Sequence, residues 1–460
     1  MKKWNVFFTL SFLFLITYRC PAQSFQWAVD YTGEIPSANN EAYAIALDNS
    51  GNVYVTGMSD PDNICTINTS IATVGYDASG QSIFFKRYTG CGDILDANAG
   101  KSITAATIDD ITYVYVAGRK YNDVNGTVDY VTLKYRVSDG ILLWQPTYHG
   151  SGNGYDQAVD IAVDIYGNAY VTGQSWNGSN SDYVTIKYDF DGNLQWKATY
   201  SGGTYSGGYG NDIPSSIAYA GGYVYVTGSS DGNGTGADFA TICYNYSTGA
   251  EVWATRYTSG GSNEDRANDI AADIIFHGVY VTGVSGGNFT TIRYDNLTGS
   301  QKWNNPSYTG EGKSIGLYRV PCAGGDINCY TIEAFATGST GSDGITIGYA
   351  EDNGSVLTGW PTTYSSTSFV SLGIDGYENI YVTGGYDNNY LTVMYNKDGG
   401  AFQWNRLYRH ARDPVYGDPT NQTPSGLRVD YYGNVFVTGA VEFGGTSPTA
   451  VYYTTIKYSP

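Results

Sequence analysis

A tripeptide of the form Val-Thr-Gly, or a close variant of it, recurs along the whole chain. Its glycine is found at Gly57, Gly118, Gly173, Gly228, Gly283, Gly338, Gly384 and Gly439, so successive copies are 61, 55, 55, 55, 55, 46 and 55 residues apart. Such a period indicates one supersecondary unit that is copied and stacked, because a single unit cannot bury its own apolar face. The 460 residues are therefore predicted to form one repeat array rather than several unrelated domains.

Each copy contains the residues for four short strands. An alternating apolar segment and a D-x-x-G-N turn precede the tripeptide, as in Ile161–Gly173. A loop rich in Gly, Ser and Asn leads to a third strand such as Asp182–Tyr188, and a short turn leads to a fourth strand with Trp four residues before Tyr, as at Trp196 and Tyr200. Four antiparallel strands in each of eight copies are typical of an all-β, eight-bladed β-propeller.

The two ends of the chain complete one another. After the last Val-Thr-Gly the chain has a third strand that ends near Tyr458, but no fourth strand follows. The missing strand is present at the other end, where Ser24–Gly33 carries Trp27 and Tyr31 at the expected spacing. We therefore predict that the mature N-terminal strand closes the last blade, which leaves no blade edge open.

The first residues have the composition of a secretory signal peptide. A positively charged start is followed by the apolar stretch Val6–Ile16 and a cleavage site near Ala22. We expect residues 1–22 to be removed and residues 23–460 to form the single propeller of a secreted, periplasmic or extracellular protein. No later stretch has the roughly 20 apolar residues that a membrane helix needs. The net charge of −19 argues against nucleic acid and anionic membranes as partners, because both would repel the protein.

The run GNAYVTGQS...DYVTIKYDFDGNLQW...Y, which begins at Gly167 and ends at Tyr200, resembles the bacterial β-propeller repeat called SBBP. Similar arrays are common in secreted proteins of the Bacteroidetes group, and the resemblance extends over essentially the whole mature chain. It implies a propeller whose family name refers to seven blades, whereas the chain itself predicts eight. It implies no shared catalytic motif.

Two segments, Tyr244–Trp253 and Tyr294–Trp303, are similar to the tryptophan-docking motif of eight-bladed quinoprotein dehydrogenases. In that family the motif is structural, and the pyrroloquinoline quinone and calcium site includes a disulfide between adjacent cysteines. No two cysteines are adjacent in this sequence. The similarity therefore supports the number of blades and the packing of tryptophan, but not redox activity.

Long, variable loops join strand two to strand three and one blade to the next, and they favour one face as the binding surface. Trp176 is the only mature tryptophan outside the fourth strands, and Tyr205 and Tyr209 lie in a neighbouring long loop. An exposed aromatic ring can stack on a sugar or on a partner side chain. Trp176 can equally pack over its own blade.

Carboxylates recur near the innermost strands. Asp156, Asp212 and Asp265 lie five residues before the first-strand isoleucines, and Asp160 and Asp269 directly precede two of those isoleucines. These groups could form an acidic ring that binds a cation or a basic partner. Alternatively, they cap turns by accepting hydrogen bonds from backbone N–H groups.

One loop begins like a calcium-binding loop, with Asp231, Asn233 and Asp238 as oxygen donors. It lacks the closing glutamate, because Ile242 stands at the twelfth position. We therefore expect no cofactor, and calcium is the one ion for which the sequence offers candidate ligands.

Five cysteines remain after the leader, and an exported chain can keep disulfides. Cys322 and Cys329 flank a turn-rich segment and are predicted to pair. Cys65 and Cys91 lie in one repeat and form a weaker second pair. Cys243 lies within a strand and is predicted to be a buried free thiol.

Catalytic motifs are scarce. His149, His277 and His410 belong to no His-x-x-x-His pair, and there is no Gly-x-Ser-x-Gly elbow. We predict a monomeric, secreted binding module that uses its long-loop face to hold a glycan or a protein at the cell exterior. The alternative is an exported carbohydrate-active hydrolase or lyase, which needs two carboxylates in a pocket at the channel mouth, at least one with a raised pKa.

Overall fold

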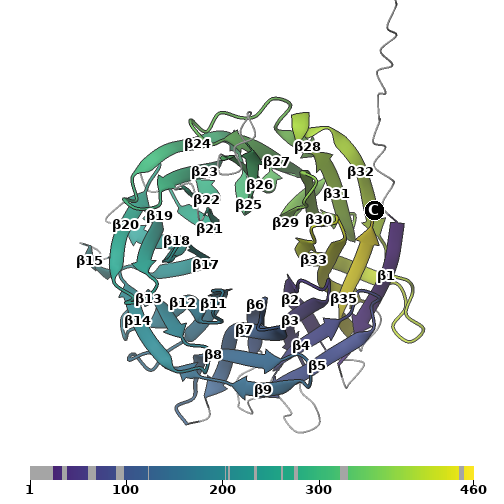
Figure 1. Cartoon of the computed structure of the whole chain (residues 1–460), viewed down its shortest axis with the longest axis horizontal. Helices are drawn as coiled ribbons and strands as arrows, with labels where there is room; N and C mark the ends of the chain where they lie inside the picture. The colour runs from purple at the N-terminus through teal and green to yellow at the C-terminus, as the bar shows by residue number, and fades with distance from the viewer. Residues whose placement is uncertain are drawn as a thin grey trace, which may run out of the picture.

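A computed structural model of the chain describes residues 24–33, 39–60, 69–89, 98–122, 124–202, 204–205, 208–232, 236–260, 263–273, 278–321, 330–444 and 450–460. Eight antiparallel sheets are arranged as blades around a central axis (Figure 1). The predicted fold, an all-β eight-bladed propeller, is confirmed. The predicted signal peptide, residues 1–22, lies outside the described residues. Within those residues, we find no helix long and apolar enough to cross a membrane.

The first four blades follow one another along the chain, each with its first strand innermost (Figure 1). Blade 1 contains β2 (Asn40–Leu47), β3 (Val53–Ser59), β4 (Ser70–Tyr76) and β5 (Ser82–Thr89). Blade 2 contains β6 (Ala99–Ile108), β7 (Ile111–Asn122), β8 (Thr127–Arg136), β9 (Ile141–Trp144) and β10 (Thr147–Tyr148). Blade 3 contains β11 (Asp156–Val163), β12 (Ala169–Trp176), β13 (Ser181–Tyr188) and β14 (Leu194–Tyr200). Blade 4 contains β17 (Asp212–Ala220), β18 (Tyr223–Gly232), β19 (Gly236–Asn245) and β20 (Glu251–Tyr257), and the hairpin of β15 (Thr204–Tyr205) and β16 (Gly208–Tyr209) precedes it.

The remaining blades repeat the pattern. Blade 5 contains β21 (Asp265–Ala272), β22 (Gly278–Ser285), β23 (Asn288–Asp295) and β24 (Gln301–Thr309). Blade 6 contains β25 (Glu311–Pro321), β26 (Tyr330–Thr340), β27 (Asp343–Ala350) and β28 (Thr362–Tyr364). Blade 7 contains β29 (Thr367–Ile374), β30 (Asn379–Tyr386), β31 (Asn389–Asn396), a 3-10 turn (Asp398–Gly400) and β32 (Phe402–Tyr408). Blade 8 contains β33 (Pro419–Val429), β34 (Val435–Phe443) and β35 (Ala450–Ser459), with β1 (Ser24–Tyr31) as its fourth strand.

The N-terminal strand closes the ring, as predicted. In Figure 1 the purple β1 lies beside the yellow β35 at the outer edge of blade 8. The two strands pair antiparallel, from Ser24 opposite Ser459 to Tyr31 opposite Tyr453. The edge of β35 is therefore covered by residues from the other end of the chain.

The Val-Thr-Gly tripeptide is explained by the pairing of the first two strands. In every blade the first strand carries an extra residue, which bends its backbone toward the glycine of the second strand. A Cβ atom on Gly173 would lie 2.0 Å from the carbonyl oxygen of Gln157, and the corresponding distance is 1.9–2.2 Å at the glycine of every copy. Thr172 is buried, and its hydroxyl lies 3.2 Å from that of Thr185 on the third strand. The tripeptide is therefore a packing signature.

The D-x-x-G-N turns join strands one and two through a single carboxylate. Asp164 Oδ1 accepts hydrogen bonds of 2.9 Å from the backbone N–H groups of Tyr166 and Asn168. Asp164 Oδ2 accepts from Asn168 Nδ2 at 2.7 Å and from the Tyr170 hydroxyl at 3.0 Å. The same four bonds recur at Asp48 and Asp375. These aspartates are structural caps.

The fourth-strand tryptophans join each blade to the next one. Trp196 Nε1 donates a 2.9 Å hydrogen bond to the carbonyl of Tyr246, in a turn whose Gly249 lies against the indole face. Among the described residues, Trp404 Nε1 has no partner, because the corresponding turn of blade 8 is interrupted by the chain ends. Equivalent bonds are made by Trp27, Trp144, Trp253, Trp303 and Trp360.

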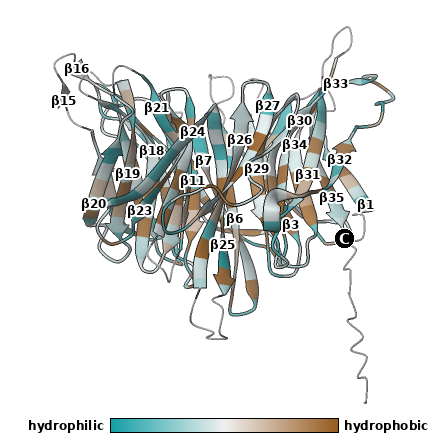
Figure 2. Ribbon diagram, turned by 90° about the horizontal axis from the view of Figure 1, so that it is seen from above, coloured by the Kyte–Doolittle hydropathy of each residue, from teal (hydrophilic) through white to brown (hydrophobic). Residues whose placement is uncertain are grey.

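The connections fall on two faces. Loops between strands two and three and between blades lie on the upper face in Figure 2, where the β15–β16 hairpin and the start of β33 project. We call this the long-loop face. The turns between strands one and two and between strands three and four lie on the opposite, short-turn face.

Candidate functional site

Three buried aspartates stand at the base of the long-loop face. Asp156, Asp212 and Asp265 begin β11, β17 and β21, and each is at most 1% exposed. Asp156 Oδ2 accepts a 2.7 Å hydrogen bond from Gly150 N–H in the loop between blades, while its Oδ1 accepts a 3.0 Å bond from Trp176 N–H. The carboxylate therefore ties together two loops that come from different parts of the blade.

Asp265 and Asp212 also accept hydrogen bonds from two separate segments of the chain. Asp265 accepts hydrogen bonds from Ser259 N–H at 2.7 Å and from Gly286 N–H at 2.8 Å. Asp212 accepts a 2.7 Å bond from Gly202 N–H and a bond from the Ser230 hydroxyl. Each of the three carboxylates accepts at least one hydrogen bond from a backbone N–H group, which is typical of a turn cap. Their role in ligand binding stays a prediction.

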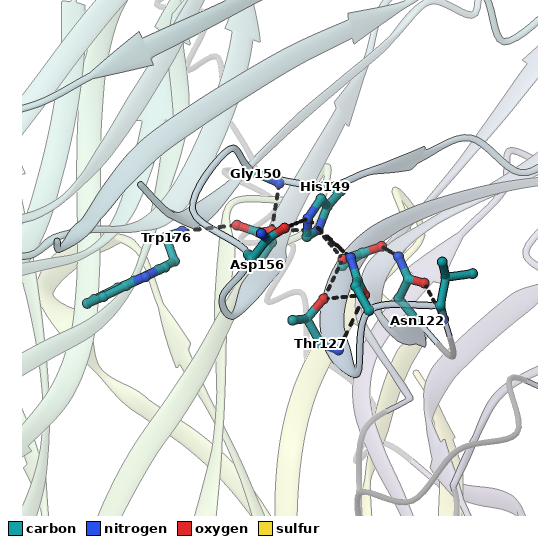
Figure 3. Close-up of polar contacts among 10 residues, drawn as sticks. Asn122, Thr127, His149, Gly150, Asp156 and Trp176 are labelled. Atoms are coloured by element: carbon teal, nitrogen blue, oxygen red, sulfur yellow. Dashed lines mark hydrogen bonds and ion pairs between the residues drawn. The ribbon is translucent and has the colours of Figure 1, made fainter. Parts of the chain in front are cut away.

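The loop between blades 2 and 3 contains a cluster of titratable groups (Figure 3). His149 Nδ1 lies 2.8 Å from Asp129 Oδ1 and 3.6 Å from Asp156 Oδ2. His149 Nε2 lies 3.0 Å from Asn153 Oδ1. Burial raises the pKa of Asp156, and hydrogen bonds to Asn153 and Asp129 raise the pKa of His149.

This cluster is the one group of possible metal ligands among the described residues, with the ligand atoms of Asp129, His149 and Asp156 within 4.8 Å of one another. A metal-binding imidazole must offer a lone pair. The nearest partners of the two ring nitrogens of His149 are oxygens, of Asp129 at 2.8 Å and of Asn153 at 3.0 Å, which suits an imidazolium that donates two N–H groups; the amide nitrogen of Asn125 lies further away, 3.2 Å from Nε2. The geometry therefore favours an ion pair that links β8 to the loop before β11.

The ion pair predicts a pH-dependent contribution to stability. Because the pKa of His149 is raised, the folded chain holds this proton more tightly than the unfolded chain. The stabilisation is fully present below the ordinary histidine value of about 6.5 and is lost as the pH rises through the raised value. We expect His149→Gln to lower the thermal midpoint clearly at about pH 5.5 and little at about pH 8.5. An equal loss at both pH values would contradict the ion pair.

The predicted aromatic residues lie in the same region. Trp176 ends β12 and is half-buried, and its indole covers Gly154, where a Cβ atom would lie 2.2 Å from the ring. This contact agrees with the second expectation for Trp176, that its side chain packs over its own blade. Tyr205 and Tyr209 lie on β15 and β16, which project above the ring in Figure 2. Their role in binding stays a prediction.

A second site lies in the central channel, where a cavity of about 440 Å³ is lined by the innermost strands. Asp160 Oδ1 accepts from the Ser102 hydroxyl at 2.6 Å, and its Oδ2 accepts from Ile217 N–H at 2.9 Å. Asp269 Oδ2 accepts from Ile315 N–H at 2.9 Å. Each carboxylate thus binds the backbone of the next blade.

Ser216 brings these two carboxylates together. Its hydroxyl oxygen lies 3.1 Å from Asp160 Oδ2 and 3.0 Å from Asp269 Oδ1. Burial raises the pKa of both carboxyls, that of Asp269 to about 6, and the Asp160 charge adds to the effect on Asp269. Arg428 adds a positive charge to the same lining. The sequence placed Asp160 and Asp269 on the innermost strands, but it did not identify Ser216 or Arg428.

The calcium-like loop is described in part. Asp238 is paired with Arg256 at 2.8 Å, and Asp231 accepts a 2.8 Å hydrogen bond from Asn211 N–H. Asn233 lies outside the described residues, so calcium binding stays a prediction.

The cysteine predictions are tested only for the strand position. Cys243 is a buried free thiol, as expected, and burial raises its pKa to about 12. The predicted pair Cys322 and Cys329 lies outside the described residues, as do Cys65 and Cys91.

Comparisons with known proteins support the fold. The family model described as SBBP, beta-propeller repeat, matches residues 30–64 and 147–179. These two segments are similar to that repeat. No curated protein matches the chain.

Three solved structures illustrate the likeness in fold. Sqt1 of Chaetomium thermophilum, bound to the N-terminus of the ribosomal protein L10, is 11% identical, with a TM-score of 0.55 over 90% of this chain and 96% of that one. The C-terminal WD40 domain of Sif2 is 10% identical, with a TM-score of 0.55 over 95% and 98%. A europium-containing methanol dehydrogenase is 10% identical, with a TM-score of 0.51 over 95% and 93%. At this identity the likeness concerns the fold alone.

Proposed function

We propose that the protein is an exported interaction scaffold whose long-loop face binds a partner protein. The observation that carries this proposal is the repeated clamp at Asp156, Asp212 and Asp265, which fixes the bases of two kinds of loop in three consecutive blades. Fixed bases reduce the entropy that loops lose on binding, while the loop tips remain free to differ. The signal-like leader supports a site of action outside the cell.

The loop between blades 7 and 8 contains an ordered turn that holds an apolar side chain in solvent. Asp413 Oδ1 accepts hydrogen bonds from the N–H groups of Val415 at 2.7 Å and Tyr416 at 2.9 Å. The Tyr452 hydroxyl donates to Asp413 Oδ2 at 3.2 Å. Val415 is nevertheless 79% exposed, so an apolar side chain is held outward on an ordered turn. Such a side chain suits an apolar contact with a protein.

The fold neighbours support a protein partner only in general terms. Sqt1 was solved with the N-terminus of the ribosomal protein L10 bound. A ring of this fold can therefore serve as a platform for another polypeptide.

Capture from the exported proteins of the source cells tests the proposal. We expect immobilised propeller to retain a defined partner, and Val415→Asp to weaken that binding by about tenfold, because a buried charge replaces an apolar contact. Ile165→Asp is the matched control, since Ile165 is 77% exposed on the short-turn face. Partner binding that is insensitive to Val415 and to other loop tips, or equally sensitive to Ile165, would overturn the proposal.

The channel gives the alternative, an exported carbohydrate-active hydrolase or lyase, one specific support. Asp160 and Asp269 share Ser216 in a cavity, and the pKa of Asp269 is raised to about 6. The same oxygens accept backbone hydrogen bonds from neighbouring blades, however, and this makes them ties of the ring. Polysaccharide cleavage that is lost in a folded Asp269→Asn variant would favour the enzyme.

A further inference from the structure

Three lysines occupy the same place in the repeat and reach across to the next blade. Lys134 Nζ donates to the carbonyl of Phe190 at 2.8 Å, and Lys187 Nζ donates to that of Tyr246 at 3.0 Å. At the junction of blades 8 and 1, Lys457 Nζ donates to the carbonyl of Ala78 at 2.9 Å. The backbone contact is therefore the same at all three junctions.

The side chain that carries the accepting carbonyl differs. The Phe190 ring centroid lies 3.1 Å from Lys134 Nζ, and the Tyr246 ring centroid lies 5.0 Å from Lys187 Nζ. In these two junctions an aromatic ring of the following blade covers the ammonium group. Ala78 has no ring to place over Lys457, which lies 5.3 Å from the ring centroid of Phe436 in its own blade.

The other residue at this junction follows the common turn. In blade 2 the ring of Tyr113 packs against Phe190 with centroids 5.3 Å apart. The equivalent residue of blade 8 is Asn434, the turn asparagine that blade 3 carries as Asn168. Ala78 is therefore the residue that distinguishes this junction from those at Phe190 and Tyr246. The result is a pocket of about 540 Å³ on the short-turn face, lined by Lys457, Ala78 and Asn434 among others.

The ammonium group of Lys457 has hydrogen-bond donors that can bind a ligand. Lys457 is 9% exposed, and within the described part of the chain its ammonium group makes one hydrogen bond, to Ala78. Burial lowers the pKa of Lys457, as expected for an ammonium group with little solvation. Lys457 lines the pocket, and its other two N–H donors can bond a ligand there.

An acceptor lies in the same pocket. Asp430 caps its turn through Tyr432 N–H at 3.0 Å and through Asn434, whose backbone N–H and Nδ2 donate at 2.8 and 2.6 Å. The fourth bond that Asp164 receives from Tyr170 is missing, because Phe436 stands at that position. Asp430 therefore keeps capacity to accept from a ligand hydroxyl.

Aromatic rings form the rim. Tyr431 and Tyr432 line the pocket and are each 66% exposed. Their ring centroids lie 5.5 Å apart, and Tyr377 of the adjacent blade lies 6.0 Å from Tyr431. Exposed rings that gather around a polar pocket are typical of a binding site rather than of a solvated surface.

We propose that this pocket binds one unit of a neutral saccharide, with a tyrosine ring stacked on the sugar and Lys457 and Asp430 bonded to its hydroxyl groups. A sugar presents an apolar ring face together with hydroxyls that both donate and accept, and the pocket supplies the complement of each. The lining contains the ammonium group of Lys457 and the carboxylates of Asp48 and Asp430, so an ionic ligand of either sign would meet a like charge. The site lies on the short-turn face and is independent of the proposed protein interaction.

An array of neutral oligosaccharides, followed by calorimetric titration of any oligosaccharide that binds, tests this site. Tyr432→Ala should lower the affinity by about tenfold through the lost stacking. Tyr166→Ala is the matched control: Tyr166 stands at the same turn position and is 64% exposed, but the junction beside it is filled by Phe190. This control should bind as the wild type does.

Two further variants close the pocket or remove its donor without harming the fold. Ala78→Phe places at this junction the ring that blade 3 already uses, and it should abolish binding. Lys457→Met removes the N–H donors, and Met394 is the natural residue at this repeat position in blade 7. Thermal unfolding of both variants should match that of the wild type.

The proposal fails if no neutral oligosaccharide binds, or if binding survives Ala78→Phe in the folded protein. Equal losses in Tyr432→Ala and Tyr166→Ala would place the sugar elsewhere on the face. Binding of a peptide with an exposed Phe or Tyr, lost in Ala78→Phe while no sugar binds, would replace the saccharide by a protein ligand. Val415→Asp should leave sugar binding unchanged, so failure here is separate from failure of the long-loop proposal.

Discussion

A chain that begins at Gly33, and so lacks β1, is expected to lose the cooperative unfolding of the closed ring. The fourth strand of blade 8 would be absent, and the edge of β35 would be left with unpaired backbone groups. Its loss also removes Trp27, whose indole N–H bonds the Ala78 carbonyl of blade 1 at 3.2 Å. We expect a loss of about 5 kcal/mol or more in the free energy of unfolding, together with aggregation through the open edge.

A salt bridge adds to the effect of this strand. His410, in the loop before blade 8, lies with Nε2 2.7 Å from Asp30 Oδ2, while Thr454 donates to Asp30 Oδ1 at 2.7 Å. Asp30 of β1 is thereby held by both the preceding loop and β35. We expect Asp30→Ala in the full chain to lower the free energy of unfolding by less than the deletion of β1 does, but by more than the substitution of an exposed residue.

Denaturant unfolding followed by circular dichroism measures these differences. A chain that begins at Ser24 is the control, because it retains all of β1. If the chain that begins at Gly33 has the same midpoint and slope as this control, β1 does not close the ring.

The fold could be predicted from the sequence because each strand leaves a local signature that repeats. The tryptophan spacing identified Trp27 as the missing fourth strand, although β1 and β35 lie at opposite ends of the chain. The signature works because Trp27 docks on the next blade as the other tryptophans do. The exception, Trp404, follows from the same rule, since its acceptor turn is where the chain ends meet.

The sites depend on contacts between blades, which no single repeat encodes. Asp160, Ser216 and Asp269 belong to three consecutive blades and meet only because the ring curves. The pocket at Lys457 arises from what is missing, namely a ring at Ala78. A motif identifies residues that recur, and therefore does not reveal a position such as Ala78, where one copy lacks the aromatic residue that another copy has.

The glycine of the Val-Thr-Gly tripeptide allows the sharpest test of the repeat, because blade 7 carries two glycines in succession. A Cβ atom on Gly384 would lie 2.2 Å from the carbonyl oxygen of Ser368 and 3.0 Å from the Cα atom of Phe369. A Cβ atom on Gly385 would have no heavy atom within 4 Å. Both residues lie in β30.

Gly384→Ala is therefore expected to destabilise the protein by about 3 kcal/mol or more, because the contact is with backbone that cannot rotate away. Gly385→Ala should be neutral or stabilising by about 0.5 kcal/mol, since alanine restricts the unfolded chain without a clash. Chemical unfolding of the two variants side by side measures the difference. Equal stabilities would mean that the bulge opposite Gly384 can move, and the tripeptide would then need another explanation. A large loss confined to Gly384 would show that the close approach of the first two strands is what fixes glycine in all eight copies.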